Sequence, residues 1–250
     1  MSTSTEQVND KEMHVIDHLA ELRNRLIFTA VFFVIFFALG FIFVEEIYHF
    51  FQKDFSFDLH ITSPGEIIWI YITIAGVTAI VGTLPILCVQ LWLFVKPGLT
   101  KKERKVSLSY IPAVVLLFII GLIFGYFMFV QLILPFLLSL NDGMFQQIFT
   151  VEGYFRFMFR IILPFAFLFE IPIMIMFLTS LGIVTPQLLK KMRKYAYFIL
   201  LVVAALITPP DLFLHLLVVF PLFMLYEISI YLASFVYRRK QERHEAFMNS

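Results

Sequence analysis

Six long apolar stretches restrict what this chain can fold into more than any other feature of its sequence. They cover residues 26–44, 67–94, 106–140, 161–181, 195–207 and 212–237. Each is apolar all round and lacks a period of two, so we expect helices and not the strands of an outer-membrane barrel. With 60% apolar and 15% charged residues, the composition is typical of polytopic membrane proteins. We therefore predict an all-α fold in which residues 1–250 form one membrane domain with six transmembrane helices.

The basic residues are distributed unequally among the segments that join these stretches. Sixteen of the nineteen lie in the N-terminal segment, in the loops after the second and fourth stretches, and in the C-terminal tail. The alternate segments contain only Lys53, Arg156 and Arg160. Because segments rich in Lys and Arg stay in the cytoplasm, we predict that both termini are cytoplasmic. The predicted location is the cell membrane, with the thylakoid membrane as the less favoured alternative.

The stretches also differ in length. As a helix, the stretch 195–207 covers only about 20 Å, whereas the hydrocarbon core of a bilayer is about 30 Å thick. It ends at the segment TPPD, where Pro209 and Pro210 cannot continue a helix. The stretch 106–140 is long enough to tilt, kink or protrude. Short helices beside long ones favour a locally thinned bilayer. We hypothesise that this thinning lowers the barrier to moving a polar chain across the membrane.

Sequence motifs of common enzymes are absent. The chain has no G-x-x-x-x-G-K-[ST], no H-E-x-x-H and no G-x-S-x-G motif. Its six histidines have no metal-ligand spacing, and the single cysteine, Cys88, lies in an apolar stretch. We predict that the protein is not an enzyme, uses no metal or cofactor, and binds no nucleic acid.

Two polar segments lie at the predicted cytoplasmic surface. The first, HLAELRNRL (18–26), places three leucines on one helix face beside Glu21, Arg23 and Arg25. The second, LFVKPGLTKKERK (93–105), contains a Pro-Gly turn and one acid, Glu103, among five basic residues. An amphipathic helix start and a helix cap would explain them structurally. Alternatively, Glu21 and Glu103 form a pair of carboxylates suited to two adjacent guanidinium groups.

A third feature is Glu170, the tenth residue of the fourth stretch. As a helix, this stretch places Glu170 about 15 Å deep, near the middle of the bilayer. An ionised carboxylate at that depth costs about 2.5–3.5 kcal/mol on insertion scales. We therefore expect Glu170 to face protein or a water-filled recess, and Pro172 to kink the helix beside it. In the alternative, purely structural interpretation, the Glu170 side chain forms a hydrogen bond that fixes how the helices pack.

Together these segments resemble TatC, the polytopic subunit of the twin-arginine protein translocase. Seven segments carry the resemblance in the family's order: HLAELRNRL (18–26), QLWLFVKPGLTKKERK (90–105), FEIP (169–172), LGIVTP (181–186), RKYAYF (193–198), TPPD (208–211) and LYEISI (225–230). They are spread over nearly the whole chain. The resemblance implies a concave, glove-like bundle of six helices with short fifth and sixth helices.

The resemblance also implies a function. It implies a receptor that reads the twin-arginine signal peptides of folded cargo proteins and belongs to a translocase driven by the protonmotive force. It implies single-span partners of the TatA and TatB type in the lipid bilayer, and a larger complex with further copies of the chain. The residues implied for signal-peptide binding are Glu21, Glu103, Arg23, Phe94, Pro97 and Leu99. Those implied for contact with an inserted helix are Glu170 in the membrane, and Thr208 with His215 at a docking edge.

Two other functions remain open at this point. A proton-coupled small-solute transporter would use Glu170 as its proton carrier. Such transporters usually contain internal repeats and several embedded polar groups, whereas Glu170 stands nearly alone in its stretch. A scaffold without a role in conduction is the other alternative.

Overall fold

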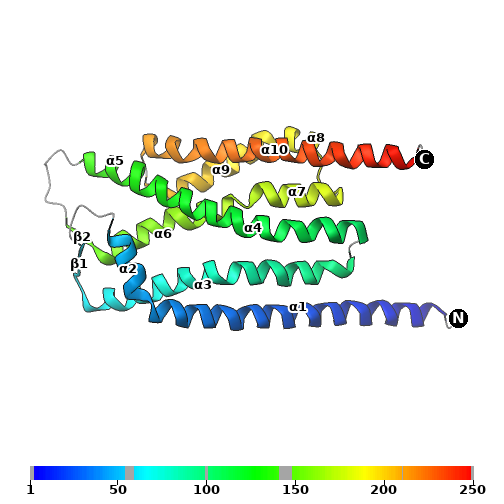
Figure 1. Ribbon diagram of the computed structural model, residues 1–250, viewed down its shortest axis with the longest axis horizontal. Coiled ribbons are helices and arrows are strands. Elements are labelled where there is room, and N and C mark those ends of the chain that lie inside the picture. Colours follow the sequence, from blue (N-terminus) through cyan, green and yellow to red (C-terminus); the bar gives the residue numbers. More distant parts are fainter. Residues whose placement is uncertain (1–2, 54–58, 99–100, 141–147, 210, 249–250) are drawn as a thin grey trace. The chain divides into compact units, whose positions relative to one another are not determined.

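The computed structural model describes residues 3–53, 59–98, 101–140, 148–209 and 211–248, and these are almost entirely helical (Figure 1). The all-α prediction is therefore confirmed. The α-helices are α1 Thr3–Ile42, α2 Val44–Gln52, α3 Pro64–Val95, α4 Lys101–Met128, α5 Leu134–Ser139, α6 Val151–Leu168, α7 Ile171–Leu181, α8 Pro186–Lys191, α9 Arg193–Ile207 and α10 Leu212–Met248. A short 3-10 helix, η1 (Lys96–Gly98), follows α3, and strands β1 (Leu59–His60) and β2 (Phe149–Thr150) form one parallel pair.

Within the described residues, five helical segments are long and apolar enough to cross a membrane. They are His18–Ile42, Pro64–Val95, Tyr110–Ser139, Val151–Leu181 and Leu212–Glu242. The predicted fifth stretch corresponds to α9, whose 15 residues extend over about 22 Å. The expected short fifth helix is thus present, whereas α10, which contains the sixth stretch, has 37 residues. Six membrane crossings remain a prediction.

The chain packs as two units, Met1–Lys53 with Tyr71–Ile111, and Asp54–Ile70 with Pro112–Ser250. In the first unit, α1 runs alongside α3 (Figure 1). Glycine allows this approach, since a Cβ at Gly40 would lie 2.8 Å from the Cβ of Thr78. These two helices hold the residues around Glu21.

In the second unit, aromatic side chains fill the space between α4 and α6. Phe118, Phe155 and Phe165 are fully buried. Gly121 and Gly125, one turn apart on α4, let the two backbones approach closely, as small residues do in membrane helices. A Cβ at Gly121 would lie 2.7 Å from the Cα of Ala166, and one at Gly125 would lie 2.9 Å from the Cα of Ile162.

Two prolines interrupt helices, and the break at Pro172 is the one predicted. Pro172 lacks the N–H that the Leu168 carbonyl would accept from, and α6 ends at Leu168 while α7 begins at Ile171. Before Pro135, the chain is π-helical over Phe129–Ile133. A wider turn there accommodates the missing proline N–H.

The fourth apolar helix begins earlier than the sequence indicated. α6 starts at Val151, where the Thr150 hydroxyl caps it by accepting a backbone N–H. The charge of Arg156 lowers the local hydropathy, so the apolar stretch was predicted to begin only at residue 161. On the helix, however, Arg156 pairs with Glu152 one turn away and lies over the ring of Trp69. These contacts allow the helix to extend through charged residues.

Candidate functional site

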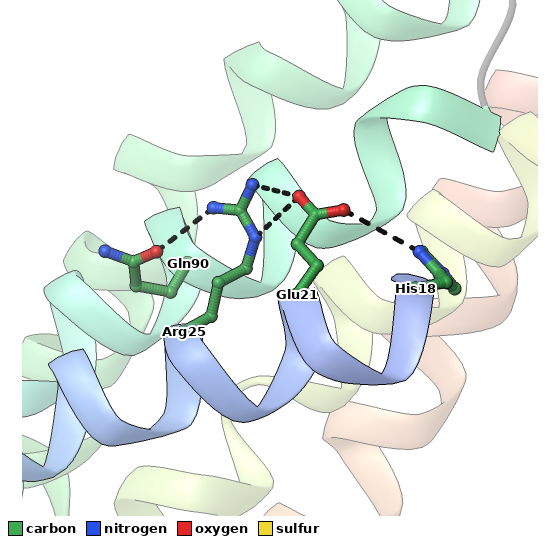
Figure 2. A network of polar contacts seen from close by, with 4 residues as sticks. All are labelled: His18, Glu21, Arg25 and Gln90. Carbon is green, nitrogen blue, oxygen red and sulfur yellow. Dashed lines mark hydrogen bonds and ion pairs between the residues drawn. The ribbon is translucent and has the colours of Figure 1, made fainter. Parts of the chain in front are cut away.

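A polar cluster lies at the start of the apolar part of α1 (Figure 2). Arg25 donates hydrogen bonds from Nε, at 3.0 Å, and from Nη2 to Glu21 Oε1. From Nη1 it donates to Gln90 Oε1 of α3 at 3.2 Å. His18 Nδ1 lies 3.8 Å from the other Glu21 oxygen, Oε2. The cluster therefore joins two helices of the first unit around one carboxylate.

The local structure follows from helix geometry. Residues three and four apart face each other on a helix, which places His18 and Arg25 on either side of Glu21. Gln90 reaches the same place because α3 runs alongside α1. Together, these contacts orient the Glu21 carboxylate.

Glu21 remains accessible within this cluster. Its side chain is 37% exposed, whereas that of Arg25 is 22% exposed. The two residues help to line a shallow hollow of about 490 Å³, which Ala20, Asn24, Phe28 and Gln90 complete. Because Arg25 engages only Oε1, Oε2 keeps the capacity to accept from a further donor. A planar guanidinium group matches this arrangement of a carboxylate beside an amide oxygen.

Three other residues implied for signal-peptide binding belong to the same unit. Phe94 stacks on His18 with ring centroids 4.2 Å apart, so it lies beside the polar cluster. Pro97 is exposed within η1, which confirms the predicted turn at this position. Arg23 is exposed on α1. The structure thus brings Phe94 to the Glu21 cluster and leaves the other two on the surface.

Two more implied residues are not placed. Glu103 belongs to the first turn of α4, but its side chain is outside the described part of the structure, and Leu99 lies outside the described residues altogether. The pairing of Glu21 with Glu103 therefore stays a prediction.

Sequence reasoning did not assign His18, Arg25 and Gln90 to the site. The spacing of four residues between Glu21 and Arg25 is a usable signal for an ion pair. Gln90 gives no such signal, because its position beside Arg25 depends on how α1 and α3 pack.

Glu170 lies at the break between α6 and α7 and is only 8% exposed. The prediction that it faces protein and not lipid is confirmed. Among the described residues, neither of its buried carboxylate oxygens has a hydrogen-bond partner. The expectation of an open, wet recess around it is wrong for the chain by itself, because the packing encloses both oxygens. The burial of Glu170 thus gives no support to direct contact with a docked helix in the isolated chain.

Thr208 and His215 lie together where α9 gives way to α10. The Thr208 hydroxyl lies 3.3 Å from His215 Nδ1 and donates to the Ala204 carbonyl at 2.9 Å. Asp211 begins α10 by accepting the Leu214 N–H at 2.9 Å. Large exposed apolar side chains flank this turn: Leu206, Leu212, Phe213 and Leu216. Thr208 itself is buried and His215 is half-buried, so His215 is the polar group nearest to this apolar surface.

Arg160 adds a contact at this turn that the sequence did not predict. Its Nη2 donates to the Leu206 carbonyl at 2.6 Å. In a continuing helix, this carbonyl would accept from residue 210, but Pro210 has no N–H. Arg160 therefore supplies the donor that the proline removes and ties α6 to the end of α9.

Comparison with known proteins identifies similar sequences and structures. The family model described as Sec-independent protein translocase protein (TatC) matches residues 17–221. The chain is 46% identical over 239 residues to TatCd of Bacillus subtilis (strain 168), which covers 96% of this chain and 99% of that relative. TatCy of the same organism is 43% identical over 242 residues, with 94% of both chains covered.

A solved structure agrees with these relatives. The crystal structure of the twin arginine translocase receptor TatC matches with a TM-score of 0.77 and 31% identity, and covers 88% of this chain and 99% of that chain. None of these matches supports a small-solute transporter.

Proposed function

The chain belongs to the TatC family, and on this premise we propose that it is the signal-peptide receptor of a twin-arginine translocase, with Glu21 at the centre of the binding site. As a TatC protein, it is a multi-pass membrane component of the Sec-independent protein translocase and not an enzyme.

The observation that carries the proposed site is the accessible Glu21 carboxylate in its hollow. Arg25 and Gln90 hold this carboxylate in place, while Oε2 remains available. We propose that one arginine of the signal peptide binds Glu21 and the other binds Glu103. Phe94 next to the cluster supplies an apolar surface for the flanking residues, and Arg23, Pro97 and Leu99 complete it.

The partners and the topology are further parts of this proposal. The distribution of basic residues supports six membrane helices with both termini in the cytoplasm. The exposed apolar side chains around Thr208 and His215 support this turn as a docking edge for a single-span TatA or TatB helix. We propose that the complex contains several copies of the chain and uses the protonmotive force.

Site-specific crosslinking tests the receptor proposal. A photoreactive amino acid placed at Ala20 or Asn24, which line the hollow beside Glu21, leaves both carboxylates in the full-length protein. It should crosslink to a signal peptide with Arg-Arg, and far less to the same peptide with Lys-Lys. Lysine lacks the planar fork that pairs with a carboxylate through two bonds. The same label at exposed Glu46 on α2 serves as the control. Equal crosslinking of both peptides at positions 20 and 24 would contradict the proposal.

We propose that a helix inserted beside this chain supplies the donor that the Glu170 carboxylate lacks. Glu170→Ala should therefore reduce export of a twin-arginine cargo several-fold without lowering the amount of folded protein in the membrane. Its oxygens have no partner among the described residues, so truncation removes no hydrogen bond from this chain and relieves a buried polar group. The measurement is the amount of exported cargo per folded variant protein, with the abundance and the thermal midpoint of the variant determined in parallel. A parallel loss of abundance would instead assign Glu170 a purely structural role.

A further inference from the structure

A second polar hollow is formed entirely within the second unit, where α8, α9 and α10 meet. Its volume is about 330 Å³. The lining residues that matter here are Lys190, Arg193, Glu227, Tyr231, Ser234 and Arg238. None of them belongs to the signal-peptide site or to the docking edge proposed above, so nothing assigned so far explains this hollow.

The hollow has a surplus of positive charge. Arg193 Nη2 donates to Glu227 Oε2 at 2.6 Å, and the Tyr197 hydroxyl donates to Oε1 at 2.5 Å, so the Glu227 carboxylate is neutralised and both its oxygens are engaged. Within the described part of the chain, Lys190 and Arg238 form no ion pair. Arg193 Nε is buried and has no partner there. Two basic side chains that line the hollow, Lys190 and Arg238, are therefore available to bind an anion.

The position of the hollow along α10 matches the surface of a membrane. From Leu212 to Tyr231 the helix extends about 28 Å, close to the thickness of the hydrocarbon core. Tyr231 is 76% exposed, and at the start of α9 Lys194 Nζ lies 5.0 Å from the ring centre of exposed Tyr195. Exposed aromatic and basic side chains together mark the level of lipid headgroups.

An apolar stripe leads to the hollow along α10. Met224, Ile228, Tyr231 and Phe235 are all exposed, and spacings of four, three and four residues place them on one helix face. Tyr231 and Phe235 at the end of this stripe also line the hollow. A ligand with an anionic head and a long apolar tail would contact both features, whereas inorganic phosphate would use only the hollow.

We propose that this hollow binds the phosphodiester group of an anionic phospholipid. Lys190 and Arg238 contact the phosphate oxygens, Ser234 borders the same space, and an acyl chain lies along the stripe on α10. Basic hollows between membrane helices are suited to such headgroups. This proposal is independent of the signal-peptide site and survives if that site proves wrong.

Native mass spectrometry of the full-length protein in detergent tests this site. We expect one bound phosphatidylglycerol at lipid concentrations at which phosphatidylcholine does not bind. The double variant Lys190→Gln with Arg238→Gln should weaken this adduct by roughly tenfold or more, since each basic residue contributes about fivefold near an anionic lipid. Lys191→Gln with Lys194→Gln is the matched control, because it removes two charges from the same helix junction outside the hollow.

The outcomes separate the lipid site from its alternatives. An unchanged adduct in the control and no competition by excess inorganic phosphate would support the proposal. Equal weakening of the lipid adduct in the control variant would show diffuse attraction between charges. Displacement of the lipid by inorganic phosphate would show a site for free anions. Either result would overturn the proposed lipid site. Both altered side chains in the hollow are exposed, so an unchanged thermal midpoint should accompany the loss of lipid.

Discussion

Glu21→Gln is expected to weaken binding of a twin-arginine signal peptide by roughly tenfold or more, because the amide keeps the size of the side chain but loses the charge that a guanidinium pairs with. Folding should be little affected, since the pair with Arg25 is partly exposed, the amide oxygen can still accept from Arg25, and ion pairs near the surface contribute little to stability. Binding of a fluorescent signal peptide to the purified protein in detergent, beside its thermal midpoint, is the measurement.

A matched charge change provides the control for this result. Glu46→Gln removes the same charge from an exposed position on α2, and its affinity should stay at the wild-type value. Glu103→Gln should resemble Glu21→Gln, and the double variant should bind more weakly than either. Wild-type affinity in Glu21→Gln would exclude this carboxylate from recognition.

Replacing both Gly121 and Gly125 with Val should remove most of the folded protein. Each new Cβ would lie under 3.0 Å from a backbone Cα of α6, so neither helix can yield by a side-chain rotation. Overpacking of this kind costs about 1–3 kcal/mol for each site, a large part of a total stability of about 5–15 kcal/mol. The yield in the monodisperse peak after extraction, and its thermal midpoint, should both fall.

Gly76→Val in α3 separates this packing effect from a general effect of losing a helical glycine. A Cβ at Gly76 would have no atom within 4 Å, so this variant should fold normally. A normal yield of the double variant at Gly121 and Gly125, or an equal loss at Gly76, would show that close contact between α4 and α6 is not required.

Much of the fold was predictable because membrane helices depend on local properties of the sequence. Apolar length located most of the helices, and Pro172 located the break after α6. The start of α6 was missed because Arg156 depends on a distant aromatic ring, Trp69, as well as on Glu152. The pairing of Leu59 with Phe149 joins residues far apart in the sequence and has no local signal. The pattern GLIFG (121–125) is typical of close helix packing, although it does not identify the partner helix.

The candidate site was predictable to a smaller extent. The Thr208 hydroxyl and His215 Nδ1 lie 3.3 Å apart because the turn between α9 and α10 is short, whereas their role as a docking edge stays a prediction. For Glu170, the sequence predicted a side chain that faces protein and not lipid, but the expected recess proved to be enclosed. The contact between Arg25 and Gln90 depends on tertiary packing, which no spacing within α1 reveals.

The most direct test of the proposed recognition is a double-mutant cycle across the complex. Affinities are measured for signal peptides with Arg-Arg and with Lys-Lys, each with the wild-type protein and with Glu21→Gln. We predict that the change to Lys-Lys weakens binding to the wild type by roughly tenfold or more, and binding to Glu21→Gln far less, because the partner of the guanidinium is already gone. The same factor in both proteins would contradict contact between Glu21 and the signal arginines.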